Sequence, residues 1–471
     1  MSLSGATARV PGAAGSAVAD ARPFHWEFTP EPIPREVFRI EGGRPLNGSV
    51  TISGSKNAAV KLLAAATLTG ERCRFTNVPE IEDVRVMADT LRDLGVVVDH
   101  PASNVYEVAS GDVDWLFVPL EAAAKMRASF ILLGPLLARF GRVIISNPGG
   151  DRIGRRPVNL HVDAMRALGA EIEYRNGYYF ARSPGRLRGT ALEFPFVSVM
   201  GTENAILAAV LADGRTTIHP AAEEPEVDDL IGFLQTMGAE VRRTTPDTIE
   251  ITGRKRLRGG EHRVIPDRIE AGTFVVAAAV TGGRVTLEGA PCDHLGAFLE
   301  LLDRVGVNVT CRGDTIEASG LNREHFRAVD VTTAPYPGLA TDLQPPTCVL
   351  LTQATGRSHV HETIFEDRLE FLAGLSRMGA RIRVQDANHA TITGVAPLHG
   401  AETEIGDLRA GASMILAALA AQGTSLIHGA HHVHRGYENI GRKFQDLGAS
   451  ITTVAESPAP KRRARGSPPS A

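Results

Sequence analysis

The chain has 471 residues, of which 43% are hydrophobic, so it can bury a large core and should form more than one domain. Its formal net charge is only −4, which excludes the strongly basic surface typical of proteins that bind nucleic acid or anionic membranes. No apolar run in the sequence approaches the roughly 20 residues that a membrane-spanning helix needs.

The cysteines and the two ends of the chain give further expectations. Cys73, Cys292, Cys311 and Cys348 stand far apart and form no CxxC pair. This argues against a zinc site and a disulfide framework, and it fits a cytoplasmic protein. Residues 1–36 are predicted to be a disordered extension, and residues 456–471, which hold a basic cluster, a disordered tail.

Along the chain, a short signature occurs six times. An amphipathic helical pattern is followed by a hydrophobic residue, a glycine and a β-rich run, and successive copies lie 68 to 74 residues apart. Such regular spacing indicates an internal repeat. In each copy the glycine is expected to end the helix in the left-handed conformation. The six glycines are Gly95, Gly169, Gly238, Gly306, Gly379 and Gly448.

Each copy also holds an earlier helix rich in alanine, leucine and valine, and it ends in two short strands, so the unit reads βαβαββ. Because the alanine-rich helices are apolar on every side, we expect them to be buried inside the sheets. The sequence thus predicts an α/β fold, a two-domain inside-out barrel with three repeats per domain, at 56–264 and at 37–55 plus 265–455. The buried helices are expected at 57–68, 126–137, 202–211, 272–280, 347–353 and 410–420.

The stretch 147–161 reads N-P-G-G-D-R-I-G-R-R-P-V-N-L-H. Its glycines make a flexible loop, and a helical pattern follows Pro157. A mobile loop that carries one acid and three guanidinium groups next to a helix start suits the capture of an anion. A solvated surface loop is the plainer interpretation of any single loop of this kind. The charged residues are Asp151, Arg152, Arg155 and Arg156.

Charged residues at the other helix starts differ from one repeat to the next. A non-enzymatic repeat scaffold would instead present surfaces that recur with each unit. The unlike residues offer one lysine and several arginines for phosphate and carboxylate groups, together with isolated acids for proton transfer. They are Lys56, Arg127, Asp342, Arg368, Arg409 and Arg435, and the uncharged Asn57 follows Lys56. Four histidines between positions 428 and 434 are interpreted as a strand end and the turn after it, not as metal ligands.

Eight motifs follow one another along the chain: S-G-S-K-N-A, M-R-A-S, P-G-G-D-x-I-G-x-R-P, P-D-R-I-E-x-G-T-F, T-D-L-Q, F-E-D-R, D-L-R-A-G-A and H-R-G-Y-E. In this order they closely resemble the motifs of the enolpyruvyl transferases, and among them the UDP-N-acetylglucosamine 1-carboxyvinyltransferase branch. The resemblance spans residues 38–454. That family's fold, two domains of three βαβαββ units each, agrees with the repeats counted above.

The resemblance implies that the enolpyruvyl group of phosphoenolpyruvate is transferred to a sugar hydroxyl of a uridine nucleotide, with release of phosphate and without a metal or other cofactor. It implies that Asp342 is the base for the acceptor hydroxyl, and that Asp151, Lys56 and Arg435 are also catalytic. Phosphoenolpyruvate would be bound by Lys56, Arg127, Arg156, Arg409 and Arg435. The nucleotide would be bound by Asn57, Arg156, Pro157, Asn159, Leu160, Asp342 and Ile364.

Five positions depart from the usual family pattern. Asp151 stands where many members carry a reactive cysteine, and it is a candidate proton donor for C3 of phosphoenolpyruvate. On the acceptor side, Asn159 replaces an aspartate, Glu223 an arginine and Ala340 a proline, and Phe196 stands where some members have a lysine that contacts the nucleotide phosphate. Losing one charge-assisted phosphate bond costs on the order of 1.5–3 kcal/mol.

These departures favour UMP slightly as the acceptor, which would place the enzyme in nucleoside-antibiotic biosynthesis. The alternative is UDP-N-acetylglucosamine and peptidoglycan synthesis, and the remote alternative is the non-enzymatic scaffold. Beyond the two substrates we expect neither a nucleic-acid nor a membrane partner. The protein is expected to be a monomer or a weak homo-oligomer.

Overall fold

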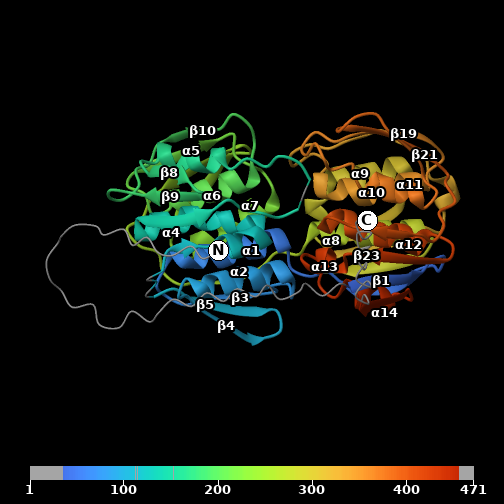
Figure 1. Cartoon of the computed structure of the whole chain (residues 1–471), viewed down its shortest axis with the longest axis horizontal. Coiled ribbons are helices and arrows are strands. Elements are labelled where there is room, and N and C mark those ends of the chain that lie inside the picture. The colour runs from blue at the N-terminus through green and yellow to red at the C-terminus, as the bar shows by residue number, and fades with distance from the viewer. Residues whose placement is uncertain (1–35, 112, 114, 152, 456–471) are drawn as a thin grey trace, which may run out of the picture. The chain divides into compact units, whose positions relative to one another are not determined.

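The computed structural model describes residues 36–111, 113, 115–151 and 153–455. The expected disordered extension, apart from Glu36, and the expected tail lie outside these residues, as does Arg152. Within them the chain forms six four-stranded sheets with helices packed beside them (Figure 1), which confirms the α/β fold of six repeats. In this part of the chain no helix combines the length and the apolar character that crossing a membrane requires.

All six sheets share one strand order, in which the first two strands are parallel and two antiparallel strands complete the sheet. The first sheet consists of β14 (Glu261–Arg263), β3 (Cys73–Thr76), β5 (Val105–Ala109) and β4 (Val97–Ala102). The second consists of β6 (Phe117–Val118), β7 (Arg142–Ser146), β9 (Tyr178–Arg182) and β8 (Glu171–Arg175). The third consists of β10 (Ala191–Glu193), β11 (Arg215–His219), β13 (Thr248–Thr252) and β12 (Glu240–Thr245). The fourth sheet consists of β2 (Asn47–Thr51), β15 (Arg284–Glu288), β17 (Thr315–Ser319) and β16 (Asn308–Arg312). The fifth consists of β18 (Val331–Thr332), β19 (Gly356–His361), β21 (His389–Gly394) and β20 (Arg381–Val384). The sixth consists of β22 (Glu402–Glu404), β23 (Thr424–His428), β1 (Glu36–Glu41) and β24 (Ser450–Ala455).

Three of these sheets are completed by a strand from a distant part of the chain. β14 pairs with β3, β2 pairs with β15, and β1 lies between β23 and β24. Two connecting segments run antiparallel where the chain passes from one half to the other: Ser55 N donates to Ile265 O at 2.7 Å, and Asp267 N donates to Ser53 O at 2.8 Å. Only the second, third and fifth units are therefore continuous in sequence.

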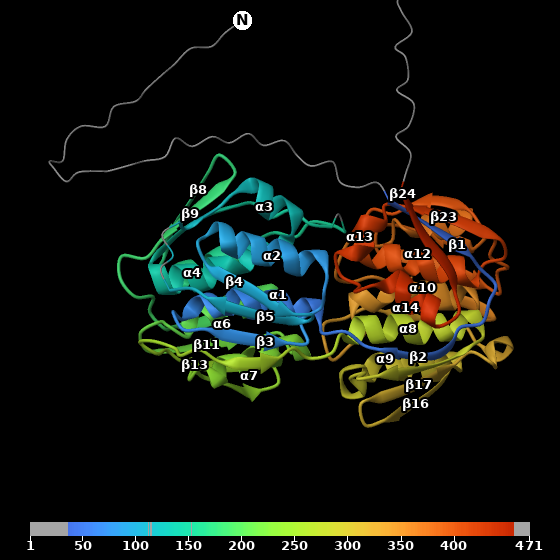
Figure 2. The same ribbon diagram turned by 90° about the horizontal axis from the view of Figure 1, so that it is seen from below.

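Buried hydrophobic side chains form two separate clusters, one drawn from residues 58–264 and the other from 38–52 and 269–451. In the second cluster α8, α10 and α12 pack against one another with sheets on either side (Figure 2), and every residue of α8 is buried. The alanine-rich helices thus lie inside, as their apolar surfaces predicted, while the domain boundaries remain a prediction. The inner helices are α1 (Lys56–Ala65), α4 (Leu133–Phe140), α6 (Val199–Ala209), α8 (Arg268–Thr281), α10 (Gln344–Thr352) and α12 (Leu408–Ala420).

The six outer helices end at the repeated glycines. Each of these glycines has a φ between 89° and 97°, the left-handed region in which a side chain would be strained, so the predicted caps are confirmed. Each cap turns the chain from a helix into the next strand. The outer helices are α2 (Glu82–Asp93), α5 (Asn159–Ala167), α7 (Pro225–Thr236), α9 (Gly296–Val305), α11 (Leu372–Arg377) and α14 (Ile440–Asp446).

Two segments differ from the expectation. The helix expected at 126–137 begins as a 3₁₀ segment and becomes α-helical only at Leu133, in keeping with Pro135, which has no N–H to donate to the carbonyl of Ile131. The expected turn after His428 contains a short helix. The remaining short elements are α3 (Leu120–Lys125), α13 (Ala430–His434), η1 (Ala66–Leu68), η2 (Arg127–Leu132), η3 (Cys292–His294), η4 (Arg323–His325) and η5 (Thr341–Leu343).

Candidate active site

Several charged residues expected from the sequence lie where helices begin. Lys56 is the first residue of α1, Arg127 the first of η2 and Arg409 the second of α12, while Asp342 lies in η5, which leads into α10. The charges of Lys56 and Arg409 both act on Asp342, so residues from different repeats come together. Helix N-termini carry a partial positive charge, which adds to that of the side chains. The resulting region attracts anions.

One chain of ion pairs joins residues from three distant segments. The carboxylate of Asp83, only 2% exposed, accepts from Lys56 Nζ at 2.9 Å and from Arg435 Nε at 2.9 Å. Arg435 also pairs with Asp151. Burial alone would raise the pKa of Asp83, but Lys56 and Arg435 outweigh it and lower that pKa. Asp83 therefore stays ionised and fixes the two cations beside each other.

Asp342 lies in a second group of ion pairs. One of its oxygens accepts from Arg368 Nη2 at 2.9 Å, and the other from Arg409 Nε at 3.0 Å. Burial alone would raise the pKa of Asp342, but Arg409, Arg368 and Lys56 hold it far below its usual value. In this arrangement Asp342 is a carboxylate and a weak proton acceptor. Its basicity depends on how tightly the two guanidinium groups hold it.

Of the arginines expected to bind phosphoenolpyruvate, Arg127 and Arg156 have no acidic partner in an ion pair among the described residues. Burial and the neighbouring charge of Arg156 lower the pKa of Arg127 to about 10. Burial also lowers the pKa of Arg156, whose guanidinium lies 5.4 Å from the centre of the Phe365 ring. In addition, Nη1 and Nη2 of Arg409 are buried without a hydrogen-bond partner in this part of the chain. Half-buried cations without an acidic partner, and a buried guanidinium with two unused nitrogens, are the expected complement of an anionic ligand.

Most of the residues expected to bind the nucleotide lie on two neighbouring stretches, whereas Asn57 lies in α1 and Asp342 in η5. Asn159 is the exposed first residue of α5, Leu160 after it is buried, and Pro157 lies in the loop before that helix. Ile364 lies half-buried on the other stretch. The two stretches are joined where Arg155 N donates to the Glu366 carboxylate at 2.8 Å and Asp367 N donates to Ile153 O at 3.2 Å. Asn57 follows Lys56 in the first turn of α1.

The sequence interpretation missed several residues that organise the site. Asp83 was not singled out from the sequence, and Arg368 was named without its partner Asp342. Glu362, fully buried, accepts from Thr341 Oγ1 at 3.0 Å and from the backbone N–H of Ile364 at 2.8 Å. It therefore ties the Asp342 turn to the Ile364 loop. Among the described residues no three His, Cys, Asp or Glu side chains are grouped to hold a metal ion.

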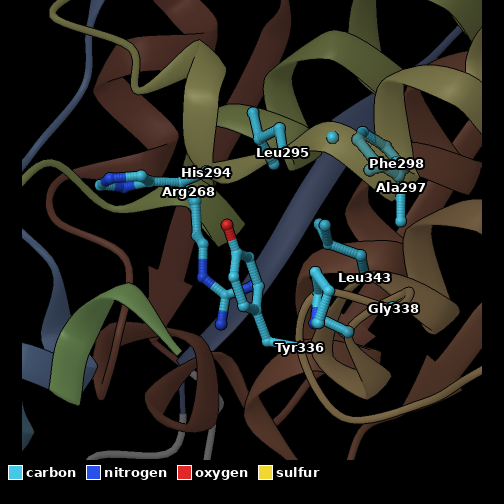
Figure 3. Close-up of a pocket in the computed structure, with 11 residues that line it drawn as sticks. Arg268, His294, Leu295, Ala297, Phe298, Tyr336, Gly338 and Leu343 are labelled. Carbon is cyan, nitrogen blue, oxygen red and sulfur yellow. The ribbon is translucent and has the colours of Figure 1, made fainter. Parts of the chain in front are cut away.

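A small pocket lies beside the Asp342 turn. Figure 3 shows the ring of Tyr336 next to the side chain of Arg268, and Ala340 also lines this pocket. The Arg268 guanidinium is already paired with Glu226 at 3.1 Å, and its carbon lies 5.5 Å from the centre of the Tyr336 ring. The volume of about 10 Å³ holds roughly one water molecule. This pocket is a packing gap and is too small for a substrate.

A family model described as EPSP synthase (3-phosphoshikimate 1-carboxyvinyltransferase) matches residues 40–444. The chain belongs to the EPSP synthase family. Two relatives named UDP-N-acetylglucosamine 1-carboxyvinyltransferase are each 44% identical to it. The one from Idiomarina loihiensis aligns over 417 residues, and the one from Shewanella denitrificans over 415, in both cases 88% of this chain and 99% of the relative.

Solved structures of this family resemble the chain as well. The enolpyruvyl transferase NikO from Streptomyces tendae matches with a TM-score of 0.82 and 26% identity, covering 90% of this chain and 100% of NikO. An EPSP synthase from Acinetobacter baumannii matches with a TM-score of 0.70 over 89% of this chain and 100% of that structure, and at 20% identity it shows the fold alone. The chain is therefore an enolpyruvyl transferase with the inside-out two-domain barrel of the EPSP synthase family.

Enolpyruvyl transfer fits a site built from cations. The acceptor oxygen adds to C2 of phosphoenolpyruvate while C3 takes a proton, and the tetrahedral intermediate then loses the C3 proton and expels phosphate. Both the carboxylate and the phosphate of phosphoenolpyruvate are anionic throughout. Fixed guanidinium and ammonium groups can neutralise them without reorganising during the reaction.

We expect fosfomycin, an epoxide antibiotic, to leave the protein covalently unmodified at position 151, because a carboxylate is a far poorer nucleophile than a thiolate. Fosfomycin should inactivate the Asp151→Cys variant in a time-dependent way, because Arg435, which pairs with Asp151, would stabilise a thiolate at position 151. Residual phosphate release after preincubation with fosfomycin would measure inactivation. Mass spectrometry of the peptide that holds residue 151 would measure covalent labelling. The native cysteines, present in both proteins, are the internal control. Rapid labelling of Asp151 in the unmodified protein would contradict the prediction.

Proposed function

We propose that the protein transfers the enolpyruvyl group of phosphoenolpyruvate to a sugar hydroxyl of UDP-N-acetylglucosamine, a reaction of peptidoglycan synthesis. The observation that carries this proposal is the 44% identity to relatives named for that reaction, over 99% of their length, against 26% for NikO. The preference for UMP inferred from the acceptor-side residues is not confirmed by these comparisons. The cytoplasmic location and the monomeric or weakly oligomeric state stay predictions.

In this proposal Lys56, Arg127, Arg156, Arg409 and Arg435 bind phosphoenolpyruvate. The absence of an acidic partner for Arg127 and Arg156 among the described residues supports this, as do the free Nη atoms of Arg409. Lys56 and Arg435 are held by Asp83, so they are already in place before the substrate arrives. A prearranged cation loses little conformational entropy when it binds an anion.

Asp342 is the proposed base for the acceptor hydroxyl. Its low pKa depends on Arg409 and Arg368, and burial opposes them. When the carboxylate of phosphoenolpyruvate draws Arg409 away, burial raises the pKa of Asp342, and the group becomes a stronger base. Binding of phosphoenolpyruvate would thus activate the base for the acceptor hydroxyl. Asp151, paired with Arg435, is the proposed group for proton transfer at C3.

UMP remains the second candidate acceptor. The observation that favours it is the exposed side chain of Phe196, 52% accessible, at a position where some family members supply a lysine for the nucleotide phosphate. An aromatic ring offers no charge to a diphosphate. UMP, with one phosphate and no second sugar, would lose less from this substitution.

The acceptor can be identified by phosphate release at matched concentrations of the two nucleotides. We expect kcat/KM for UDP-N-acetylglucosamine to exceed that for UMP by about 100-fold or more, because the second phosphate and the acetylated sugar add several specific contacts. The Phe196→Lys variant should raise kcat/KM for UDP-N-acetylglucosamine by roughly 10-fold through one charge-assisted bond, and leave KM for phosphoenolpyruvate unchanged. A higher kcat/KM for UMP would assign the protein to nucleoside modification instead.

A further inference from the structure

Two of the four cysteines, far apart in sequence, lie beside each other in the fold. Cys292 begins η3, and its Sγ donates to the carbonyl of Thr315 at 3.8 Å. Thr315 opens β17 and is paired with Arg312 of β16, the residue after Cys311. The thiol of Cys292 is therefore held over the end of the β16–β17 hairpin that carries Cys311.

Cys311 lies on the side of β16 that faces the second hydrophobic cluster, against which Cys292 also packs. Alternate residues of a strand share a face, and Cys311 shares the face of β16 with Val309, which packs against the second hydrophobic cluster. Cys292 packs against the same cluster. Burial, and after it the neighbouring Cys311 side chain, raises the pKa of Cys292 to about 12. Both cysteines are free thiols in this structure.

The two thiols differ in their access to solvent. Cys311 is exposed, whereas Cys292 is partly covered and remains protonated at neutral pH. An exposed thiol next to a protected one is the usual arrangement of an oxidant-sensing pair, in which the first thiol is oxidised and the second resolves it. Cys73 and Cys348 are both buried, and burial raises the pKa of Cys73 to about 11 and that of Cys348 further still.

We propose that Cys292 and Cys311 form a reversible intramolecular disulfide when the protein meets hydrogen peroxide. The Cys311 sulfur attacks one peroxide oxygen and breaks the O–O bond, giving a sulfenic acid and one molecule of water. The Cys292 sulfur then attacks the sulfenic sulfur, loses its proton, and displaces the hydroxyl group as a second water. In total two thiols and one peroxide give one disulfide and two waters, and a dithiol reductant reverses the reaction.

The disulfide would join η3 to the β16–β17 hairpin. η3 ends at His294, and His294 and Leu295 line the pocket shown in Figure 3. Ala340 and Leu343, on either side of Asp342, line the same pocket. The link closes a loop of about 20 residues, which restricts the unfolded chain. We therefore expect the oxidised protein to unfold a few degrees above the reduced one.

The test uses the reduced full-length protein, treated with hydrogen peroxide, alkylated and digested with trypsin without reductant. Cleavage after Arg284, Arg304 and Arg312 leaves the two cysteines in the separate peptides 285–304 and 305–312. We expect these two peptides to be joined in one species, which dithiothreitol separates. The peptide 328–357, which holds the buried Cys348, should stay unlinked in the same digest and serves as the internal control.

The variants Cys292→Ser and Cys311→Ser supply the matched comparison. In Cys292→Ser the exposed thiol should proceed to sulfinic acid, and Cys311→Ser should resist oxidation. Phenylarsine oxide, which binds two adjacent thiols at once, should bind the reduced native protein and neither variant. The proposal fails if peroxide converts Cys311 of the native protein to sulfinic acid without the linked peptide. It fails equally if Cys311 links to a second copy of the chain or to another cysteine.

Discussion

Replacing Asp342 by asparagine should lower kcat by about 10²- to 10⁴-fold, the usual contribution of a positioned general base. Asparagine keeps the size of the side chain, and its one oxygen can still accept from either Arg368 or Arg409, but it cannot take a proton from the acceptor hydroxyl. Binding of the uridine nucleotide, measured by calorimetry, should change much less than kcat. Steady-state phosphate release would give the rates.

The matched control for this variant is Asp367→Asn, an exposed acid in the nearby loop, which should leave kcat unchanged. The Asp342→Asn substitution also leaves two buried guanidinium groups without a counter-charge. The unfolding temperature of this variant must therefore be measured alongside its rates. A variant that stays folded and turns over at a near-native rate would remove Asp342 from the role of base.

Replacing Arg435 by alanine should lower kcat/KM for phosphoenolpyruvate by about 10- to 150-fold for each charge-assisted hydrogen bond that is lost. Arg435 is held between Asp83 and Asp151, so its loss also leaves Asp83 with Lys56 as its single ion-pair partner among the described residues. The effect should appear mainly with phosphoenolpyruvate as the varied substrate. Arg435→Lys should restore part of the activity, because the charge returns without the planar guanidinium.

Arg442→Ala is the matched control for Arg435. Arg442 lies on α14 with its side chain 73% exposed, and it pairs with Asp446 at 3.0 Å. Exposed pairs of this kind contribute little, so this variant should behave like the native protein. Equal effects of the two substitutions would show that Arg435 acts through general surface charge and not at the site.

Local sequence patterns predicted the architecture well. Each outer helix is followed closely by a strand, and a residue in the left-handed conformation makes the tight turn between them. Glycine adopts this conformation most readily, so the six glycines marked the ends of the six repeated helices in the sequence. The inner helices were identifiable because they are apolar on every side. The three strands that complete distant sheets were not assigned to their partners, since β1, β2 and β14 follow ordinary strand patterns and nothing local states which strand they pair with.

The site was predicted residue by residue but not as a set of contacts. Lys56 and Arg435 were named from their motifs, yet the acid that holds them together, Asp83, sits at a helix start where acids are common. Arg368 was likewise visible without its partner Asp342. Cys292 and Cys311 were taken as scattered cysteines because the proximity of two residues on different elements depends on tertiary structure.

The central claim is that the acceptor oxygen bonds to carbon and that phosphate leaves with the bridging oxygen. The direct measurement uses phosphoenolpyruvate labelled with ¹⁸O at the bridge between C2 and phosphorus, incubated with the protein and UDP-N-acetylglucosamine. Our account predicts phosphate release that depends on the nucleotide, with the label in the phosphate and an enolpyruvyl ether on the sugar. Unlabelled phosphate, or release that is independent of the nucleotide, would contradict it.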